Sequence, residues 1–284
     1  LTRDPISVAL APGFDRLGVE AEHLSWGDAR RWQQRADEHD RALVGTEGVV
    51  EALRVVKDDA ELARLAAACS ITVDALEWLF ADVVAVGRTE RELARALERR
   101  FVDLGADAVA FPSIVASGAN AAVPHHAPTG RALQPGDLVT VDCGALVDGY
   151  HADCTRTVAI GHLDDDLARA YAAVEEAQAR GRAAAVADAT GADVDAACRD
   201  HLRSVGLGEA FLHGTGHGVG LDIHEAPAVA KGSAATLAVA TALTVEPGAY
   251  LPGLGGVRIE DTLVVTADGP PTVLTPAPRE LRIL

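Results

Sequence analysis

The order of the secondary-structure signals constrains the fold of this chain more than any other feature of its sequence. Helical spacing of apolar residues alternates with runs rich in β-branched residues, so that a helix pair and then a strand pair occur twice. In chain order, the expected helices and strands are 51–86, 89–105, 138–146, 150–160, 164–187, 192–205, 243–250 and 256–265. This order predicts an α+β fold of two similar halves, and such halves usually enclose a site between them.

Two local signals support this order, and one segment departs from it. Thr89 and Glu92 form the pattern of a capping box, which predicts that a helix begins there. The turn 147–149 (Val-Asp-Gly) separates two strand-like segments and predicts a hairpin. Residues 1–48 lack the regular order, and we interpret them either as the end of a separate domain or as an extension packed on residues 49–284.

The composition argues against several classes of protein. The chain carries 25 Lys and Arg against 42 Asp and Glu, a net charge of −17, and it has no basic stripe, so we expect no nucleic-acid partner. The longest uncharged apolar stretch, 234–245, is too short to span a bilayer, so we expect no membrane association. Four cysteines without a CxxC pair predict reduced thiols in a cytoplasmic protein.

Two aspartates, Asp142 and Asp153, lie in the expected hairpin on either side of its turn. We expect their carboxylates to lie roughly opposite each other, where Cβ atoms are about 4.5–5.5 Å apart. Carboxylates that close repel each other unless a cation lies between them or one of them holds a proton. The pair is therefore compatible with a metal site, and also with one aspartate that faces solvent or caps the turn.

Three histidines, His213, His217 and His224, fall within twelve residues and have four glycines among them. Core packing does not need this pattern, whereas glycine lets the backbone approach a ligand closely. The pattern is compatible with a metal-binding or catalytic role as well as with a structural one. A phosphate-binding loop is disfavoured because the run lacks the lysine and the glycine spacing of such loops.

The second expected strand pair carries Glu246, Arg258 and Glu260. Arg258 and Glu260 are two residues apart on one strand, so they share a face and, taken alone, indicate an ion pair. Four carboxylates and one imidazole now lie on expected strands: Asp142, Asp153, His217, Glu246 and Glu260. Oxygen and nitrogen ligands of this kind suit Mn²⁺ or Co²⁺, and shared carboxylates indicate two metal ions that activate a water molecule.

His125 and His126 follow Pro124 in an expected loop. Taken alone, two loop histidines indicate side chains exposed to water.

Together these motifs resemble the methionine aminopeptidase/prolidase family of metallopeptidases, from about residue 49 to the C-terminus. The five candidate ligands occur in the family's order and inside its local patterns, among them 244–248 (Thr-Val-Glu-Pro-Gly) and 256–262 (Gly-Val-Arg-Ile-Glu-Asp-Thr). The resemblance implies the pita-bread fold, in which two pseudo-symmetric halves surround a dinuclear metal site.

The resemblance also implies a role for each candidate ligand. Asp142 would bind one metal ion, and Asp153 and Glu260 would bridge the two ions. His217 and Glu246 would bind the second ion, and Glu246 would also relay protons from the attacking water.

Three further histidines match residues that contact the substrate in the family. His125 would contact the scissile amide or the peptide backbone, and His224 would stabilise the tetrahedral intermediate, which needs a positioned donor. His213 would line the substrate pocket, as in the proline-specific branch. Cys143 and Cys154 each follow a candidate ligand, so we expect them to be core thiols.

Arg258, together with 153–157 and 224–227, resembles the proline-specific branch and not methionine aminopeptidases. The resemblance therefore implies an Xaa-Pro dipeptidase or aminopeptidase, a homodimer that acts on short peptides with proline in second position, with Arg258 in its site. The cofactors would be two divalent ions, Mn²⁺ before Co²⁺ or Zn²⁺. Residues 1–48 resemble the end of this branch's N-terminal domain. The alternatives are a methionine aminopeptidase-like enzyme and a non-catalytic binding protein on the same fold.

Overall fold

The computed structural model describes residues 15–284, which belong to two compact units. The first unit extends to Leu53 and the second covers Arg54–Leu284. All nine candidate site residues named above lie in the second unit.

The first unit is a small parallel β-α-β arrangement. Strands β1 (Arg16–Glu20) and β2 (Ala42–Thr46) pair in parallel, and α2 (Trp26–Glu38) connects them. Ser25 precedes α2 and caps it by accepting a hydrogen bond from the backbone N–H of Asp28 at 3.1 Å. A short helix, α3 (Val49–Arg54), follows β2.

The helices of the second unit form two pairs, as the sequence predicts. They are α4 (Asp59–Trp78), α5 (Glu90–Asp103), α6 (Asp165–Ala184) and α7 (Gly191–Ser204). The capping box of Thr89 and Glu92 begins α5, as expected. The prediction of a single helix over 51–86 was wrong, because this segment contains two helices. After α3 ends, a second capping box, formed by Asp58 and Glu61, begins α4. A π-helical turn, Leu79–Val83, ends α4.

The strands of the second unit form two interrupted hairpins and their neighbours. They are β3 (Ala108–Val109), β4 (Ile114–Ser117), β5 (Leu138–Cys143), β6 (Ala145–Val147), β7 (Tyr150–His151), β8 (Cys154–Ala159), β9 (Gly216–Gly218), β10 (Glu225–Val229), β11 (Ala242–Val245), β12 (Gly248–Leu251), β13 (Gly255–Arg258), β14 (Asp261–Val264) and β15 (Thr272–Val273). One sheet has the order β4-β5-β8 and another β10-β9-β11-β14-β15. All pairings in these two sheets are antiparallel.

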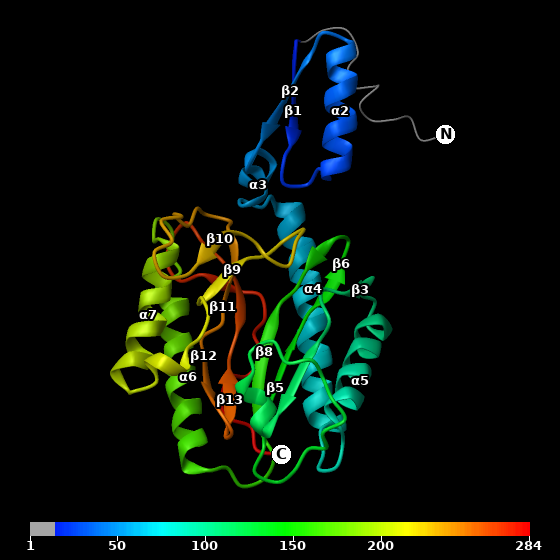
Figure 1. The fold of residues 1–284 in the computed structure, drawn as a ribbon. Helices are drawn as coiled ribbons and strands as arrows, with labels where there is room; N and C mark the ends of the chain where they lie inside the picture. The colour runs from blue at the N-terminus through cyan, green and yellow to red at the C-terminus, as the bar shows by residue number, and fades with distance from the viewer. Residues whose placement is uncertain (1–14) are drawn as a thin grey trace. The chain divides into compact units, whose positions relative to one another are not determined.

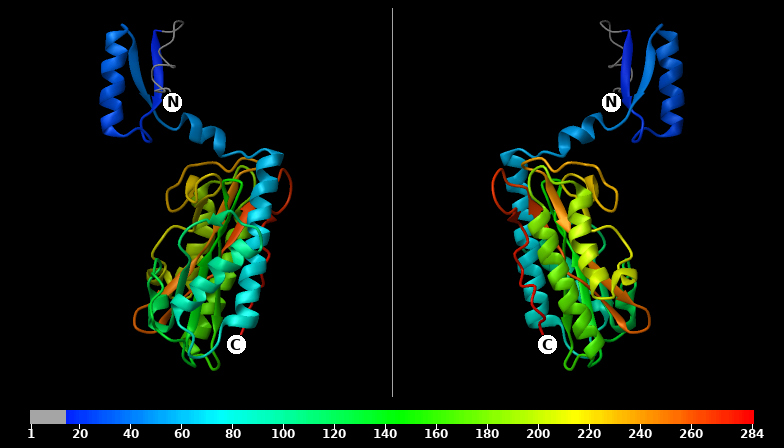
Figure 2. Two further views of the ribbon diagram at one scale, coloured as in Figure 1. Left: turned by 90° about the vertical axis from the view of Figure 1, so that its right-hand side faces the viewer. Right: turned by 90° about the vertical axis from the view of Figure 1, so that its left-hand side faces the viewer.

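The helix pairs cover the two halves, and the strands run between them (Figure 1). One side view brings α4 and α5 toward the reader, and the opposite view brings α6 and α7 (Figure 2). One apolar cluster packs α4 and α5 on β4, β5 and β8, and another packs α6 and α7 on β11 to β14. The expected α+β fold of two similar halves is confirmed, and each half has a core of its own.

All four cysteines are buried and unpaired, including Cys143 and Cys154, which lie in the core of the first half as expected. No helix in the described part of the chain has the length and the apolar composition that a bilayer crossing requires.

Candidate metal centre

The first hairpin is interrupted where it carries its two aspartates. Strand β5 pairs with β8 and β6 pairs with β7, and the ladder breaks at Gly144 on one side and at 152–153 on the other. The register pairs Asp142 with Thr155, so the prediction that Asp142 lies opposite Asp153 was wrong. The register is the same on both sides of the break, so Asp153 lies two residues before Thr155 and on the face that Asp142 shares.

The second hairpin repeats this plan. Its ladder breaks at 246–247, between β11 and β12, and at 259–260, between β13 and β14, and each break holds a candidate ligand. The backbone N–H of Glu260 donates to the carbonyl oxygen of Thr155 at 3.1 Å, and the Thr155 hydroxyl donates to Glu260 Oε2 at 2.7 Å. These bonds join the two hairpins side by side, so that the carboxylates of both breaks converge.

His217 reaches the same point from β9, between two glycines. A Cβ on Gly216 or Gly218 would lie 2.0 Å from the carbonyl oxygen of Thr244 or Ala226, so only glycine lets β9 pass this close to its neighbours. His217 Nδ1 lies 3.0 Å from the Gly218 carbonyl oxygen, which requires the proton on Nδ1 and leaves Nε2 free to bind.

The ligand atoms of Asp153, His217 and Glu260 all lie within 4.8 Å of one another. His217 Nε2 is 3.5 Å from Asp153 Oδ2 and 3.4 Å from Glu246 Oε1. A cavity of about 260 Å³ opens over them, and every candidate site residue lines it: His125, Asp142, Asp153, His213, His217, His224, Glu246, Arg258 and Glu260. The structure thus brings together all nine residues that the sequence singles out.

Two carboxylate oxygens in this cavity are buried without any hydrogen-bond partner, Asp142 Oδ1 and Glu260 Oε1. A buried polar atom without a partner costs about 1–3 kcal/mol, and more when it is charged. A divalent cation would satisfy both oxygens and offset the repulsion between the carboxylates. The residues present therefore fit a cation with oxygen and imidazole ligands.

The protonation behaviour of these groups agrees with that fit. Burial raises the pKa of Glu246 to about 8; Arg258 opposes the shift and Asp142 adds to it. Burial and the neighbouring carboxylates also raise the pKa values of Asp153 and Glu260 well above their usual range. Burial lowers the pKa of His217 to about 4, so its imidazole is neutral and able to bind a metal.

Arg258 is the one guanidinium among the residues that line this cavity. Its Nη2 donates to Asp142 Oδ2 at 2.7 Å and its Nη1 to the Tyr250 hydroxyl at 2.8 Å. The expected ion pair with Glu260 was therefore wrong, because the hairpin contact brings Asp142 within reach of the guanidinium instead. Tyr250 also contacts His213 Nε2 at 2.7 Å and so links Arg258 to that histidine.

Sequence reasoning missed Tyr250, although a signal was available. A tyrosine in a buried strand needs a partner for its hydroxyl group, and Tyr250 lies four residues after Glu246 on such a strand. It also missed the apolar wall of the cavity, which consists of Phe111, Ile114 and Ile223.

Besides His213, two more histidines line the cavity without belonging to the carboxylate cluster. The ring of His224 packs edge-on against the ring of His217 with centroids 4.3 Å apart, and His125 lies in the loop between β4 and β5. His126, its neighbour, does not share this position, because it contacts Glu90 at 2.9 Å. His126 therefore does not simply face water, whereas His125 is exposed at the cavity.

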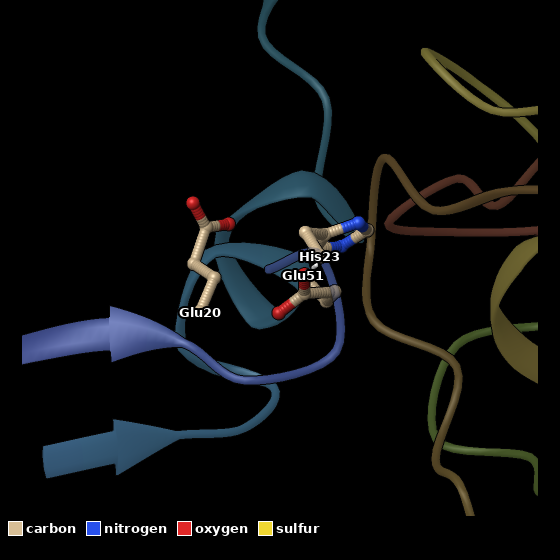
Figure 3. Close-up of side chains that lie close together, drawn as sticks. All are labelled: Glu20, His23 and Glu51. Carbon is tan, nitrogen blue, oxygen red and sulfur yellow. Dashed lines mark hydrogen bonds and ion pairs between the residues drawn. The ribbon is translucent and has the colours of Figure 1, made fainter. Parts of the chain in front are cut away.

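A second group of possible ligands lies in the first unit, where the side chains of Glu20, His23 and Glu51 are close together (Figure 3). His23 Nε2 is 3.1 Å from Glu51 Oε1. Glu20 and His23 are exposed to solvent, so these groups stay hydrated and gain little from a cation. We assign no function to this group.

The sequence profile described as metallopeptidase family M24 matches residues 63–267 of this chain. The chain is 40% identical to the "uncharacterized peptidase YqhT" of Bacillus subtilis over 272 residues, which are 96% of this chain and 76% of that protein. It is 35% identical to the Xaa-Pro dipeptidase of Pyrococcus furiosus over 267 residues, 94% of this chain and 75% of that one.

Solved structures give the same result. The structure of an Xaa-Pro dipeptidase from Bacillus anthracis matches with a TM-score of 0.94 at 40% identity, over 98% of this chain and 78% of that one. The prolidase from Pyrococcus furiosus matches with a TM-score of 0.87 at 34% identity, over 93% and 77% of the two chains.

Proposed function

Because this chain belongs to metallopeptidase family M24 and has its pita-bread fold, we propose that it is a metal-dependent exopeptidase that hydrolyses the bond between an N-terminal residue and proline. Enzymes of this family use divalent metal ions. Relatives that are 35% identical to this chain are named Xaa-Pro dipeptidases. A short peptide with proline in second position is therefore the proposed substrate.

One observation carries the proposal. Four carboxylates and a neutral imidazole converge in a small cavity, and two of the carboxylate oxygens have no hydrogen-bond partner. A non-catalytic protein gains nothing from such a cluster, since buried unpaired carboxylates destabilise a fold. This favours an enzyme over a binding protein on the same fold.

We propose that Asp142, Asp153, His217, Glu246 and Glu260 hold two divalent ions. When bound, such ions lower the pKa of water and polarise the scissile carbonyl group. Mn²⁺ is our first choice because hard oxygen ligands outnumber the single imidazole, with Co²⁺ and Zn²⁺ as the alternatives. Asp153 and Glu260 are the proposed shared ligands, as the resemblance to the family implies, and their ligand atoms and that of His217 lie within 4.8 Å of one another.

Glu246 is the proposed proton carrier of the reaction. This residue lines the cavity, and its Oε1 lies 3.4 Å from His217 Nε2, which places a carboxylate beside the proposed metal site, where a general base has to be within hydrogen-bond reach of the water it deprotonates. Glu246 takes a proton from the attacking water at a carboxylate oxygen and transfers it to the leaving nitrogen of proline.

The remaining cavity residues position the peptide. His125 and His224 reach the cavity from separate loops, so one contacts the scissile amide while the other donates to the developing oxyanion. Arg258 holds Asp142 in place and, through Tyr250, orients His213 at the substrate pocket. Burial and the charge of Arg258 lower the pKa of His213 to about 4, so this histidine contacts the substrate as a neutral group.

The first experiment is hydrolysis of an Ala-Pro dipeptide by this chain after loading with Mn²⁺. We expect free proline with Mn²⁺, none after chelation, and recovery when Mn²⁺ is returned. Ala-Ala serves as the matched control and should be cleaved at least about tenfold more slowly. Metal-loaded protein that cleaves no proline peptide would contradict the proposed function.

Two further substrates and two further ions make the outcome specific. Cleavage of Ala-Pro-Ala but not of Ala-Pro would indicate an aminopeptidase, and cleavage of a Met-initiated peptide alone would indicate a methionine aminopeptidase-like enzyme. Loading with Co²⁺ or Zn²⁺ in parallel identifies the preferred ion, because each preparation can be checked for metal content by elemental analysis.

Three broader features are also proposed. Residues 1–48 are proposed to be the end of an N-terminal domain, which the parallel β-α-β arrangement of the first unit supports. A homodimer is proposed, to be tested by light scattering. A cytoplasmic location is supported by four cysteines that are all unpaired.

A further inference from the structure

A buried glutamate outside the cavity accepts more hydrogen bonds than any candidate ligand. Glu90 is the first residue of α5, and its side chain is completely buried. Glu90 Oε1 accepts from the backbone N–H of Ser117 at 2.8 Å, from the Ser117 hydroxyl at 2.7 Å and from Asn120 Nδ2 at 2.9 Å. Neither Ser117 nor Asn120 lines the cavity.

The other oxygen is equally occupied. Glu90 Oε2 accepts from the backbone N–H of Thr129 at 2.9 Å and from its hydroxyl at 2.7 Å, and it lies 2.9 Å from His126 Nε2. Burial alone would raise the pKa of Glu90, but the bonds from Thr129, Asn120, His126 and Ser117 lower it to about 2. The carboxylate is therefore ionised over the whole physiological range.

The donors lie on both sides of the segment that enters the cavity. Ser117 and Asn120 precede Pro124 and His125, and His126 and Thr129 follow them. One carboxylate thus ties the two flanks of this segment to the start of α5. His126 points back to Glu90, whereas the adjacent His125 lines the cavity.

We propose that Glu90 is a positioning residue for the proposed peptidase reaction, because it fixes the loop that presents His125 to the scissile amide. Glu90 acts only through this loop, since it does not itself line the cavity. The inference rests on the proposed function and assigns a part in it to a residue that touches neither substrate nor metal.

The test is Glu90→Gln. Each oxygen of Glu90 accepts a backbone N–H, so a glutamine amide must turn its NH₂ group toward either Ser117 or Thr129 and break that flank. We expect kcat to fall about tenfold or more with KM changed less than about threefold, while the metal content stays at two ions per chain.

Glu98→Gln is the matched control on the same helix. Glu98 accepts a single bond, from the backbone N–H of Ser113 at 3.3 Å, and a glutamine retains an oxygen that can accept it. This variant should keep kcat within about twofold of the parent.

A double-mutant cycle with His125→Ala separates positioning from general destabilisation. If Glu90 acts through His125, adding Glu90→Gln to His125→Ala changes kcat less than about twofold. If the second substitution lowers kcat by the same factor as it does alone, the inference is wrong. An unaltered kcat in Glu90→Gln would also overturn it.

A milder variant covers the case in which Glu90→Gln does not fold. Thr129→Val removes one hydroxyl donor and keeps the shape of the side chain. We expect about a threefold loss of kcat, and this loss should also vanish in the His125→Ala background. Wild-type protein that hydrolyses no proline peptide contradicts the proposed function and this inference together; an active wild type with additive losses contradicts the inference alone.

Discussion

Glu260 and Asp261 are neighbours in the chain and are both fully buried, yet they lie in opposite surroundings. Glu260 faces the cavity, where it keeps one hydrogen bond from Thr155 and one oxygen without a partner. Asp261 faces the other side of the strand, where it accepts from Arg156 Nη2 at 2.7 Å, from Gln178 Nε2 at 2.7 Å and from Arg279 Nε at 2.6 Å.

The difference shows how two adjacent residues, one in the break and one at the start of β14, can serve the reaction and the fold separately. The Asp261 side is complete, because its charge is matched by guanidinium groups. The Glu260 side is incomplete without a cation, because its nearest charged neighbours include further carboxylates. Burial alone therefore does not identify a functional carboxylate; its partners do.

Glu260→Gln leaves the backbone intact and removes a proposed shared ligand. We expect the metal content to fall and kcat/KM with Ala-Pro to drop about 10³-fold or more, since losing a metal disables the reaction. Elemental analysis and proline release are the measurements. A variant that retains two ions and full activity would show that Glu260 is not a ligand.

Asp261→Asn tests the other side of the strand. Arg156 would lose its carboxylate while fully buried, so we expect a loss of about 3 kcal/mol in the free energy of unfolding. Urea denaturation of the metal-free protein measures it. Glu176→Gln, which removes an exposed pair with Arg180, is the control and should cost less than about 0.5 kcal/mol. Equal losses of unfolding free energy in Asp261→Asn and Glu176→Gln would show that the buried partners of Asp261 do not stabilise the fold more than an exposed ion pair does.

Glu246→Gln gives the smallest effect and the opposite sign. The pKa of Glu246 in the folded, metal-free protein is raised to about 8, above its value in the unfolded chain. The stability that this group contributes is therefore fully present below the unfolded pKa and is lost as the pH rises through about 8. At pH 9 the metal-free variant should therefore be more stable than the wild type, with a higher Tm. At pH 4 the two should coincide.

Calorimetry across this pH range decides the matter. A wild type that is as stable as the variant at pH 9 would mean that the Glu246 carboxylate is already paired. Adding Mn²⁺ should reverse the order at pH 9, because only the wild type then has its full set of proposed ligands.

The sequence was sufficient for the order and type of the major elements. Helical spacing and the capping box at Thr89 predicted the helix pairs, because these signals are local. The break before α4 was missed although Asp58 and Glu61 signal it, since the apolar spacing on both sides reads as one continuous helix. The sequence did not predict the positions of the breaks in the two hairpins, because a break depends on contacts between strands that are distant in the chain.

The sequence singled out nine residues that the structure places around one cavity, but it did not predict the contacts among them. The nine residues could be singled out because their motifs are dense and resemble a known family. The partner of Arg258 was misjudged, since Asp142 is 116 residues away in the chain. Glu90 gave no signal at all: a glutamate in the first turn of a helix is common, and its donors come from a later loop.

The glycines beside His217 limit how this protein can change over evolutionary time. With no room for even a methyl group at Gly216 or Gly218, every missense substitution there forces β9 away from Ala226 or Thr244 and displaces the imidazole. Neutral substitutions are therefore not expected at these two glycines, and a saturation library should return glycine alone at both positions. New substrate preferences can arise more readily at the apolar wall, where Phe111 and Ile223 border the cavity through side chains and not through the backbone.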